Sequence, residues 1–368
     1  MTMNTVRIST NQIAYMIILF EIGSTPLFFL GSKAKQDAWL AMAFAAVFGL
    51  LLLQLFIAIQ RKEPGLNLTQ MLILHYGRTI GTILGLLYVL YFSYESMRNV
   101  RDFGEFMSMS LLTRTPMIVT MMTVLIIGAY GVYKGIEVIF RISEILLPLV
   151  VLSYAFLLFL LLVANIVHFE KLAPIMENGP LPILKAAFPD IVSFPFGQTV
   201  VFLMLWSSNS EQTVPLKPYT AAYAAVALFL IFMNAIIIAI LGSSLAAMSS
   251  LPFLQAVQLI SIARVFERLD VFVSLLIYIG LFMKMILFYL CAVISLASMT
   301  SIAYQRWVWP VGLLILIAAF LEPNYTYHIS IGFHVSLKLF PIFQILIPVI
   351  LYATMMFKKR RRLASGLP

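Results

Sequence analysis

Long runs of apolar residues recur along this chain, separated by short polar stretches. About 20 apolar residues are enough for a helix to cross a bilayer. The pattern therefore predicts ten membrane-spanning helices, at residues 9–32, 36–60, 79–104, 116–133, 143–166, 183–206, 218–241, 271–299, 303–321 and 336–357. The runs are continuous rather than alternating, which excludes a β-barrel. The expected fold class is an all-α polytopic membrane protein.

The first and the sixth of these runs are interrupted in the middle by glycine and proline. The interruptions fall at Gly23–Pro26 and at Ser193–Gly197. Proline removes a backbone donor and glycine permits open conformations, so together they break a helix. Broken helices at corresponding places in two halves are typical of a transporter-type site near the bilayer midplane. The alternative is a pair of packing kinks, because both residues are common in membrane helices.

The matching breaks predict a five-plus-five inverted repeat within a single transmembrane domain of residues 1–368. The first repeat covers about 9–166 and the second about 183–357. Because each repeat has an odd number of helices, the second would insert upside down. The connection at about 242–270 is amphipathic at helical spacing, with apolar Leu254, Val257, Ile260, Ile262 and Val265. We expect it at the outer surface, as an anchor or as a lid over a cavity mouth.

Composition narrows the class of protein. The chain is 62% hydrophobic and only 11% charged, which leaves no room for a sizeable soluble domain. Its net charge of +9 comes from lysine and arginine in short loops and in the basic tail at 358–368. Such charges set membrane topology, so we expect both termini in the cytoplasm, contact with membrane lipid, and no nucleic-acid partner.

Enzyme and metal motifs are missing from the sequence. The four histidines are scattered, and no HExxH, CxxC, P-loop, GxSxG or GxGxxG pattern occurs. We therefore expect no enzymatic activity, no cofactor and no metal site.

The two breaks are the expected ligand site. Unwound backbone leaves free N–H groups that can receive a carboxylate, serine and threonine add hydroxyls, and the phenylalanines can cover an apolar part of a ligand. Tyr94 in the third span either faces the same cavity or belongs to the core. The candidate ligand-binding residues are Gly23, Ser24, Thr25, Pro26, Ser193, Phe194, Pro195, Phe196, Gly197 and Tyr94.

Three ionisable residues are expected at membrane depth: Glu21, Glu95 and Lys284. A charge at the bilayer centre costs roughly 2.5–3.5 kcal/mol on insertion scales, so each needs a partner or a cavity. We expect Glu21 and Lys284 to approach one another or to share a water-filled cavity. The alternative is a buried pair with a structural role only.

Four further charges follow Glu95 in the third span. Their i,i+4 spacing predicts two pairs on one helix, Arg98 with Asp102 and Arg101 with Glu105. Self-pairing at a helix end is the simplest interpretation of this cluster.

Several longer motifs are distinctive in combination: ISTNQ at Ile8–Gln12, EIGSTPLFF at Glu21–Phe29, QDAWLA at Gln36–Ala41, RNVRDFGEFM at Arg98–Met107, RISEILLP at Arg141–Pro148 and ISIARVFERLD at Ile260–Asp270. With them the chain resembles the spore germination permease family, the integral-membrane B subunits of nutrient germinant receptors in endospore-forming bacteria. That family belongs to the amino acid–polyamine–organocation transporter superfamily.

The resemblance implies a ten-helix inverted-repeat fold and a role in sensing a nutrient, often an amino acid or a sugar. It also implies that the chain acts together with a larger A subunit and a lipoprotein C subunit in the spore inner membrane. The implied pocket comprises Gly23, Ser24 and Thr25 with Ser193–Gly197, and the resemblance does not extend to Lys284.

Two functions would use this site. One is a germinant receptor subunit that binds a small nutrient, an amino acid, and triggers germination by a conformational change with its partner subunits. The other is a proton- or sodium-coupled amino acid symporter, with Glu21, Glu95 and Lys284 as coupling groups. The family-specific loop residues favour the receptor, and the small openings at Gly23 and Gly197 favour a compact ligand with a carboxylate.

Overall fold

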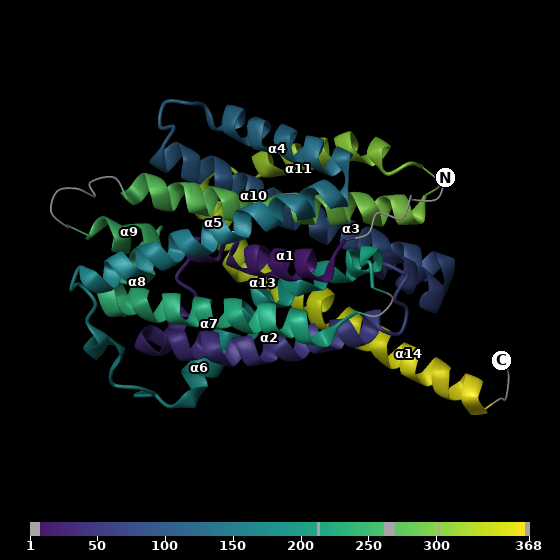
Figure 1. The fold of residues 1–368 in the computed structure, drawn as a ribbon, viewed down its shortest axis with the longest axis horizontal. Helices are drawn as coiled ribbons and strands as arrows, with labels where there is room; N and C mark the ends of the chain where they lie inside the picture. The colour runs from purple at the N-terminus through teal and green to yellow at the C-terminus, as the bar shows by residue number, and fades with distance from the viewer. Residues whose placement is uncertain (1–7, 212–213, 261–268, 301, 365–368) are drawn as a thin grey trace.

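A computed structural model of the chain describes residues 8–211, 214–260, 269–300 and 302–364, with side chains only as far as 357. This part of the chain is a bundle of helices that run along the long axis of the molecule (Figure 1). It contains no strand, only an isolated bridge between Ile8 and Asn209. The all-α polytopic membrane fold is confirmed.

The helices, in chain order, are α1 (Thr10–Ile22), α2 (Ala38–Gln60), α3 (Leu68–Ser110), α4 (Met117–Lys134), α5 (Ile136–Val163), α6 (Pro180–Ala186), α7 (Leu216–Leu241), α8 (Ser243–Met248), α9 (Pro252–Gln258), α10 (Leu269–Met299), α11 (Gln305–Leu321), α12 (Tyr325–Ile331), α13 (Leu337–Pro341) and α14 (Ile347–Ala364). Short 3-10 and π segments join them: η1 (Thr25–Leu27), η2 (Ser32–Asp37), η3 (Phe169–Leu172), η4 (Ala187–Ile191), η5 (Phe196–Met204), η6 (Trp206–Ser208), η7 (Gly332–Ser336) and η8 (Ile342–Leu346).

Within the described ranges, eight helical segments are long and apolar enough to cross a membrane. The apolar α11 is shorter, and the first span stops being a regular helix after 13 residues, at Ile22. The count of ten therefore stays a prediction. Three helices begin earlier than expected: α3 begins at Leu68 rather than near 79, with a non-helical Gly77 inside it, and α5 begins at Ile136 rather than near 143. The last helical stretch begins at Tyr325 rather than near 336.

The molecule has two ends, which we name from Figure 1. The loop end, at the left, carries α6, α8 and α9, and the tail end, at the right, is where α14 points. At the tail end the chain entering α1 lies beside the connection that follows η5, since Ile8 N donates to Ser208 O over 2.9 Å. The start of α1 therefore lies at the end of the molecule toward which α14 points (Figure 1).

The described part of the amphipathic connection, up to residue 260, lies at the loop end and contains the two short helices α8 and α9. Phe253, Leu254, Ala256 and Val257 of α9 are buried, and α9 packs against α7, α10 and η1. It thus lies beside the second half of the first span. Residues 261–268 fall outside the described ranges, as do the side chains of the basic tail.

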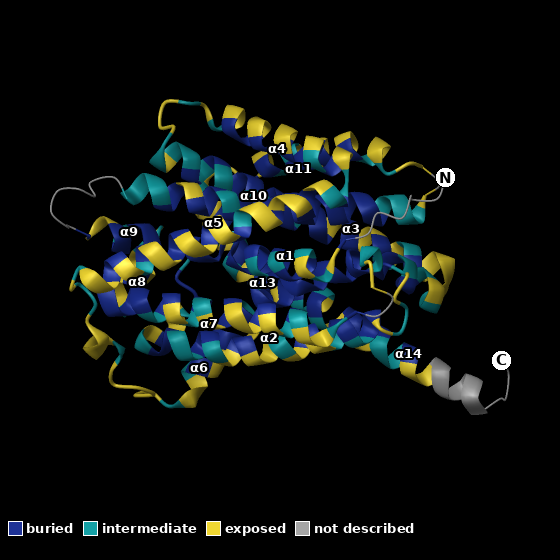
Figure 2. Ribbon diagram, in the orientation of Figure 1, coloured by how far each residue is buried: buried dark blue, intermediate teal, exposed yellow. Residues whose placement is uncertain are grey.

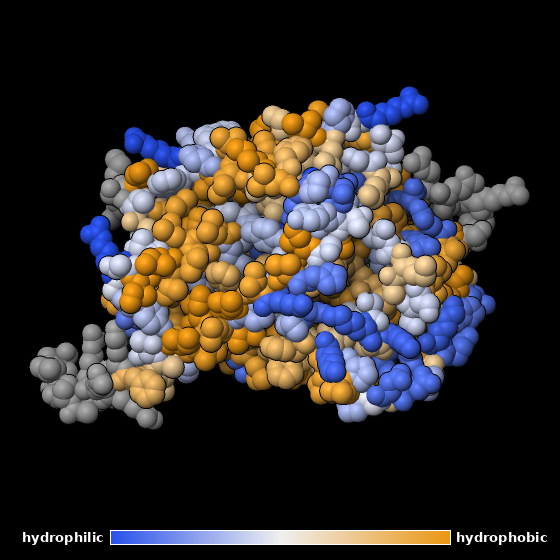
Figure 3. All heavy atoms as spheres, turned by 180° about the vertical axis from the view of Figure 1, so that it is seen from behind, coloured by the Kyte–Doolittle hydropathy of each residue, from blue (hydrophilic) through white to orange (hydrophobic). Residues whose placement is uncertain are grey.

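The bundle buries its centre and exposes an apolar surface to its surroundings. Of the apolar window in α10, 72% is buried, so α10 is a central helix, whereas α3 buries only 28% (Figure 2). Large side chains such as Ile145, Leu152 and Leu228 are exposed. From behind, apolar side chains cover much of the middle of the molecule and hydrophilic residues gather mainly toward the loop end (Figure 3). Contiguous exposed apolar area of this kind suits lipid.

A buried cluster of charged groups ties α3 to the start of the last helical stretch. His328 is fully buried, and its imidazole lies between two carboxylates: Nε2 is 3.1 Å from Asp102 Oδ1, and Nδ1 contacts Glu322 Oε2. Arg101 donates to Glu105 and to the carbonyls of Ala319 and Glu322.

This cluster decides which of the expected pairs on α3 form. The Arg101–Glu105 pair is confirmed, with an N···O distance of 2.6 Å. The Arg98–Asp102 pair is not formed: Asp102 pairs with His328, and Arg98 donates to the His328 carbonyl over 3.0 Å. The competing partner is more than 200 residues away in the chain, which i,i+4 reasoning cannot detect.

Replacing His328 by alanine would leave two buried carboxylates without their shared partner. Removing one member of a buried charged set typically costs about 3–5 kcal/mol. We expect His328→Ala to lower the thermal unfolding midpoint of the purified protein markedly. His334→Ala, on an exposed histidine six residues later, is the control and should leave the midpoint nearly unchanged. Equal midpoints for the two variants would contradict a structural role for the cluster.

Candidate functional site

The first break ends α1 at Gly23, a position whose backbone conformation favours glycine. Gly23 has φ +24°, and its N–H still donates to Leu19 O over 2.9 Å. Thr25 Oγ1 donates to the Glu21 carbonyl over 2.7 Å, so a side chain satisfies an oxygen that the interrupted helix would otherwise leave free. The proline at 26 then sits inside the single 3-10 turn η1.

The second break is satisfied by a residue from the last helical stretch. Gln344 Nε2 donates to the Ser193 carbonyl over 3.0 Å and to Tyr91 Oη over 2.9 Å. Gly197 makes room for it, because a Cβ at 197 would lie 2.3 Å from Gln344 Oε1. Beyond the break the chain continues as the nine-residue 3-10 helix η5, a length that often marks a hinge.

Lys284 reaches the space between the two breaks. Its Cδ would be 2.8 Å from a Cβ at Gly23, and its ammonium lies over the rings of Phe194 (4.4 Å) and Phe20 (5.2 Å). Cations are attracted to aromatic faces, the more so when water is excluded. No ion pair within 4.0 Å joins Lys284 to Glu21 in the described part of the chain, and their charged atoms have no hydrogen-bond partner there. The expected approach of the two side chains is thus not a direct contact.

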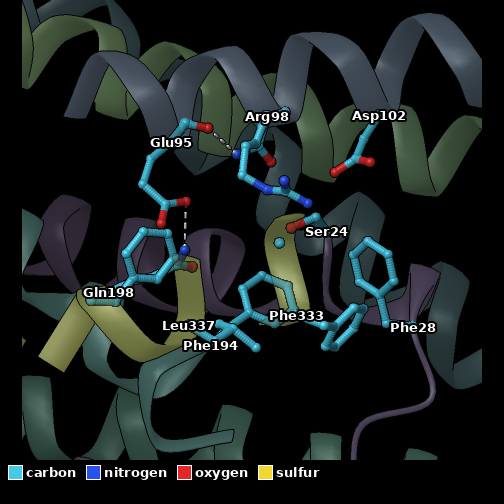
Figure 4. A pocket seen from close by; sticks show the side chains of 12 residues that line it. Ser24, Phe28, Glu95, Arg98, Asp102, Phe194, Gln198, Phe333 and Leu337 are labelled. Carbon is cyan, nitrogen blue, oxygen red and sulfur yellow. Dashed lines mark hydrogen bonds between the residues drawn. The ribbon is translucent and has the colours of Figure 1, made fainter. Parts of the chain in front are cut away.

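A small cavity opens beside the first break (Figure 4). Its volume is about 40 Å³, room for a few water molecules. Both breaks, α3 and the last helical stretch contribute to its wall, through Ser24, Phe28, Glu95, Arg98, Asn99, Asp102, Phe194, Gln198, Gly332, Phe333, Leu337 and Phe340. The cavity therefore lies where the sequence predicts a ligand site.

Three aromatic rings close one side of this cavity. Phe28 meets Phe194 edge to face at 5.8 Å between centroids, and meets Phe333 in the same way at 5.9 Å. These rings belong to the first span, the sixth span and η7, and Figure 4 shows them along the same side of the cavity. A ligand larger than a few waters must separate them to enter.

The polar side of the cavity is rich in charge. Glu95 Oε2 accepts from Gln198 Nε2 over 2.7 Å, and the Glu95 carbonyl accepts from Asn99 Nδ2 over 2.8 Å. Arg98 and Asp102 lie further along α3, toward the loop end (Figure 4). These groups can bind a polar ligand, and no group of three or more metal-ligating side chains occurs in the part of the chain that the structure describes.

Of the residues predicted to bind ligand, Ser24 and Phe194 line this cavity, as does Glu95 from the predicted coupling groups. The others are placed around it: Tyr94 contacts Ser336 over 2.7 Å, and Phe196 packs against Tyr223 on the side of α2 and α7. Buried positions behind the wall are Gly23, Thr25, Pro26, Ser193, Pro195, Gly197, Glu21 and Lys284.

Sequence reasoning missed much of the wall. Asn99 and Gln198 are amides in apolar spans, a signal that was present but not used. The spacing of Arg98 and Asp102 predicts a pair at a helix end, whereas both side chains line the cavity. Nothing in the local sequence marks Gly332 or Phe333, which come from the stretch that begins earlier than predicted.

The chain is similar to proteins of a known family. The family model described as "Spore germination protein" matches residues 7–326. Spore germination protein KB of Bacillus subtilis (strain 168) is 32% identical over 363 residues, which cover 98% of this chain and 97% of that protein. Spore germination protein YndE of the same organism is 22% identical over 214 residues, 57% of this chain and 58% of that protein.

The fold has a solved counterpart. The structure of Mhp1, a nucleobase-cation-symport-1 family transporter, in a closed conformation with bromovinylhydantoin bound, superimposes with a TM-score of 0.68. The match covers 97% of this chain and 80% of that one at 14% identity, so the likeness shows the fold alone. With the family match over most of its length, the chain belongs to the spore germination protein family of membrane permeases.

Proposed function

We propose that this chain is the ligand-binding membrane subunit of a nutrient germinant receptor. It binds a small nutrient, an amino acid, in the cavity where the two broken spans meet, and it triggers germination through a conformational change. The observation that carries the proposal is the cavity itself, which both breaks line together with charged side chains of α3. A pair of kinks that served packing alone would not need buried polar groups facing a shared space.

The predicted site residues divide into two roles in this proposal. Ser24 and Phe194 contact the nutrient directly. Gly23, Thr25 and Pro26 shape the first break, and Ser193, Pro195, Phe196 and Gly197 shape the second, while Tyr94 orients the last helical stretch through Ser336.

The narrowness of the cavity supplies a way to signal. A ligand shifts an equilibrium only by binding one conformation better than another. The cavity admits little more than water while Phe28 touches Phe194 and Phe333, so a nutrient binds a conformation in which these rings are apart. Occupancy then changes how the first span, the sixth span and η7 are arranged.

The receptor works in the spore inner membrane with a larger A subunit and a lipoprotein C subunit, and both termini face the cytoplasm. The likeness to a germination protein over nearly the whole chain supports this setting. The orientation follows from the basic tail at the end of α14.

Filling the cavity at Ser24 should block the response. Ser24 has ordinary helical dihedrals, φ −86° and ψ −1°, so a larger side chain there fits the backbone but occupies the cavity. In spores of a strain that lacks the native subunit, we expect Ser24→Leu to raise the nutrient concentration for half-maximal germination at least tenfold.

Ser330→Leu is the matched control, because it makes the same change at an exposed serine that does not line the cavity. It should keep the nutrient dependence of the native chain at equal receptor levels. A Ser24→Leu chain that is present at normal levels and responds to the same nutrient concentration would place the ligand site elsewhere.

Coupled transport is the second candidate function, favoured by the buried charges. Lys284, Glu21 and one Glu95 oxygen have no hydrogen-bond partner among the described residues, as expected of groups that exchange protons or accept an ion. Proton- or sodium-coupled symport of an amino acid would use them as coupling groups. The fold shared with a transporter is compatible with this output.

Removal of the buried ammonium tests both candidates. Lys284→Met keeps the volume but removes the charge that lies over Phe194, a cavity residue. We expect it to abolish nutrient-dependent germination, whereas Lys338→Met, at an exposed lysine, should not. An unchanged germination response in Lys284→Met spores would exclude a functional role for this charge. Concentrative uptake of labelled amino acids by the purified chain in liposomes, without any germination defect in a deletion strain, would favour the symporter.

A further inference from the structure

The cavity wall carries a cation and a set of unpaired acceptors, and these groups bear on which nutrients the cavity accepts. The inference rests on the proposed function, since it concerns the ligand of that same cavity.

The cation is the guanidinium of Arg98, which hydrogen bonds and packing hold in place. Arg98 Nη1 donates to the His328 carbonyl over 3.0 Å, and the group also lies near Tyr94 Oη, at 3.5 Å. Its other side is pressed against Gly332, where a Cβ would lie 2.3 Å from Nη2 and 2.8 Å from Cζ. Only glycine at 332 therefore admits the guanidinium in this position. Both of these hydrogen bonds use Nη1, so the guanidinium, which lines the cavity, keeps further N–H donors for a ligand.

Asp102, the carboxylate whose charge acts most strongly on this group, does not contact it. Asp102 forms no ion pair with Arg98 within 4.0 Å, and its Oδ1 is taken by His328. The guanidinium thus stands beside the cavity as an anion-binding group of fixed geometry, the kind that recognises a carboxylate through two parallel hydrogen bonds.

Other side chains of the cavity wall offer hydrogen-bond acceptors. Glu95 Oε1, Asn99 Oδ1 and Gln198 Oε1 are buried and have no hydrogen-bond partner among the described residues. One N–H of each amide is already used on Glu95. The free acceptors and the negative charge of Glu95 match an ammonium group, which has three donors and no acceptor.

We propose that the cavity recognises a free α-amino acid as a zwitterion, with its carboxylate on Arg98 in the notch at Gly332 and its ammonium on Glu95, Asn99 and Gln198. An uncharged polyol would leave the guanidinium unpaired. A simple carboxylate would leave the acceptors unfilled, and a simple amine would leave Arg98 without an anion. Each alternative keeps a buried polar group unsatisfied, which is costly.

The arrangement differs from carboxylate binding at the broken first span. The segment after that break, η1, is a single turn of three residues, so its dipole is small. Arg98 brings a full charge to the opposite wall of the same cavity (Figure 4).

The test compares ligands that keep or lose one charged end. The standard L-amino acids are applied as free acids, as amides that lack the carboxylate, and as N-acetyl derivatives that lack the ammonium. Binding is measured by ligand-dependent thermal stabilisation of the purified full-length chain, and germination is measured in spores carrying the same variant. For the native chain we expect the best free amino acid to act at concentrations roughly 100-fold lower than its amide or its N-acetyl form.

Two substitutions should then remove one preference each. Arg98→Met should bring the free acid and the amide within a few-fold of each other while the preference over the N-acetyl form remains. Glu95→Gln should do the reverse. Arg78→Met, at an exposed arginine of α3 outside the cavity wall, is the control and should keep both preferences.

Gly332→Ala keeps the charge but displaces it, so it covers the case in which Arg98→Met does not fold. We expect it to weaken the binding of free amino acids at least tenfold and to leave the binding of the amides unchanged. Equal action of free acids and amides on the native chain, or a response to an uncharged sugar alone, would overturn the proposal. If these discriminations are absent although Ser24→Leu still abolishes the response, the cavity is the ligand site and only its assigned polarity is wrong. If Ser24→Leu has no effect either, the proposed function fails with it.

Discussion

Backbone that leaves helical geometry inside a bilayer must find its hydrogen bonds within the protein, and the contact between α10 and the first break is where this molecule meets that constraint. A Cβ at Gly280 would lie 2.3 Å from the Gly23 carbonyl oxygen, so α10 can approach the break only because position 280 is glycine. Lys284 lies one turn further along α10, and this approach brings its stem against Gly23 and its ammonium over Phe194. The central position of α10 and the placement of the buried charge thus have one cause.

The second break shows the same constraint solved differently, and the difference defines the cavity. Gln344 satisfies the Ser193 carbonyl from outside the broken span, which draws the last helical stretch against the sixth. That stretch also carries Gly332 and Phe333 to the cavity wall. The wall therefore combines two broken spans with α3 and a stretch of mixed helical geometry, joined by edge-to-face ring contacts worth about 0.5–1.5 kcal/mol each. Contacts of that size hold the site closed yet yield to a ligand.

The sequence predicted the elements of this site better than their contacts. The breaks at Gly23–Pro26 and Ser193–Gly197 follow from local chemistry, since glycine and proline act on their own turn of helix. The orientation of Phe196 toward α2 and α7, and the pairing of Asp102 with His328, depend on residues more than 100 positions away or on neighbouring helices. A single chain without an alignment carries no signal for such contacts. Local spacing therefore predicts a pair between Arg98 and Asp102 on one helix, although the guanidinium of Arg98 lies against Gly332.

The energetics of switching connect the charged cavity to a receptor role. Moving a two-state equilibrium from 1:99 to 99:1 requires about 5.5 kcal/mol of differential affinity. Hydrogen bonds to charged groups contribute about 1.5–3 kcal/mol each, so a shift of this size needs several such bonds, and a ligand with two charged ends can form more of them than a ligand with one. Arg98 also links the cavity to the His328 carbonyl, and through it to the Asp102–His328–Glu322 cluster at the start of the last helical stretch. This hydrogen bond joins the cavity wall on α3 directly to α12, so the guanidinium is shared between the cavity and the buried cluster.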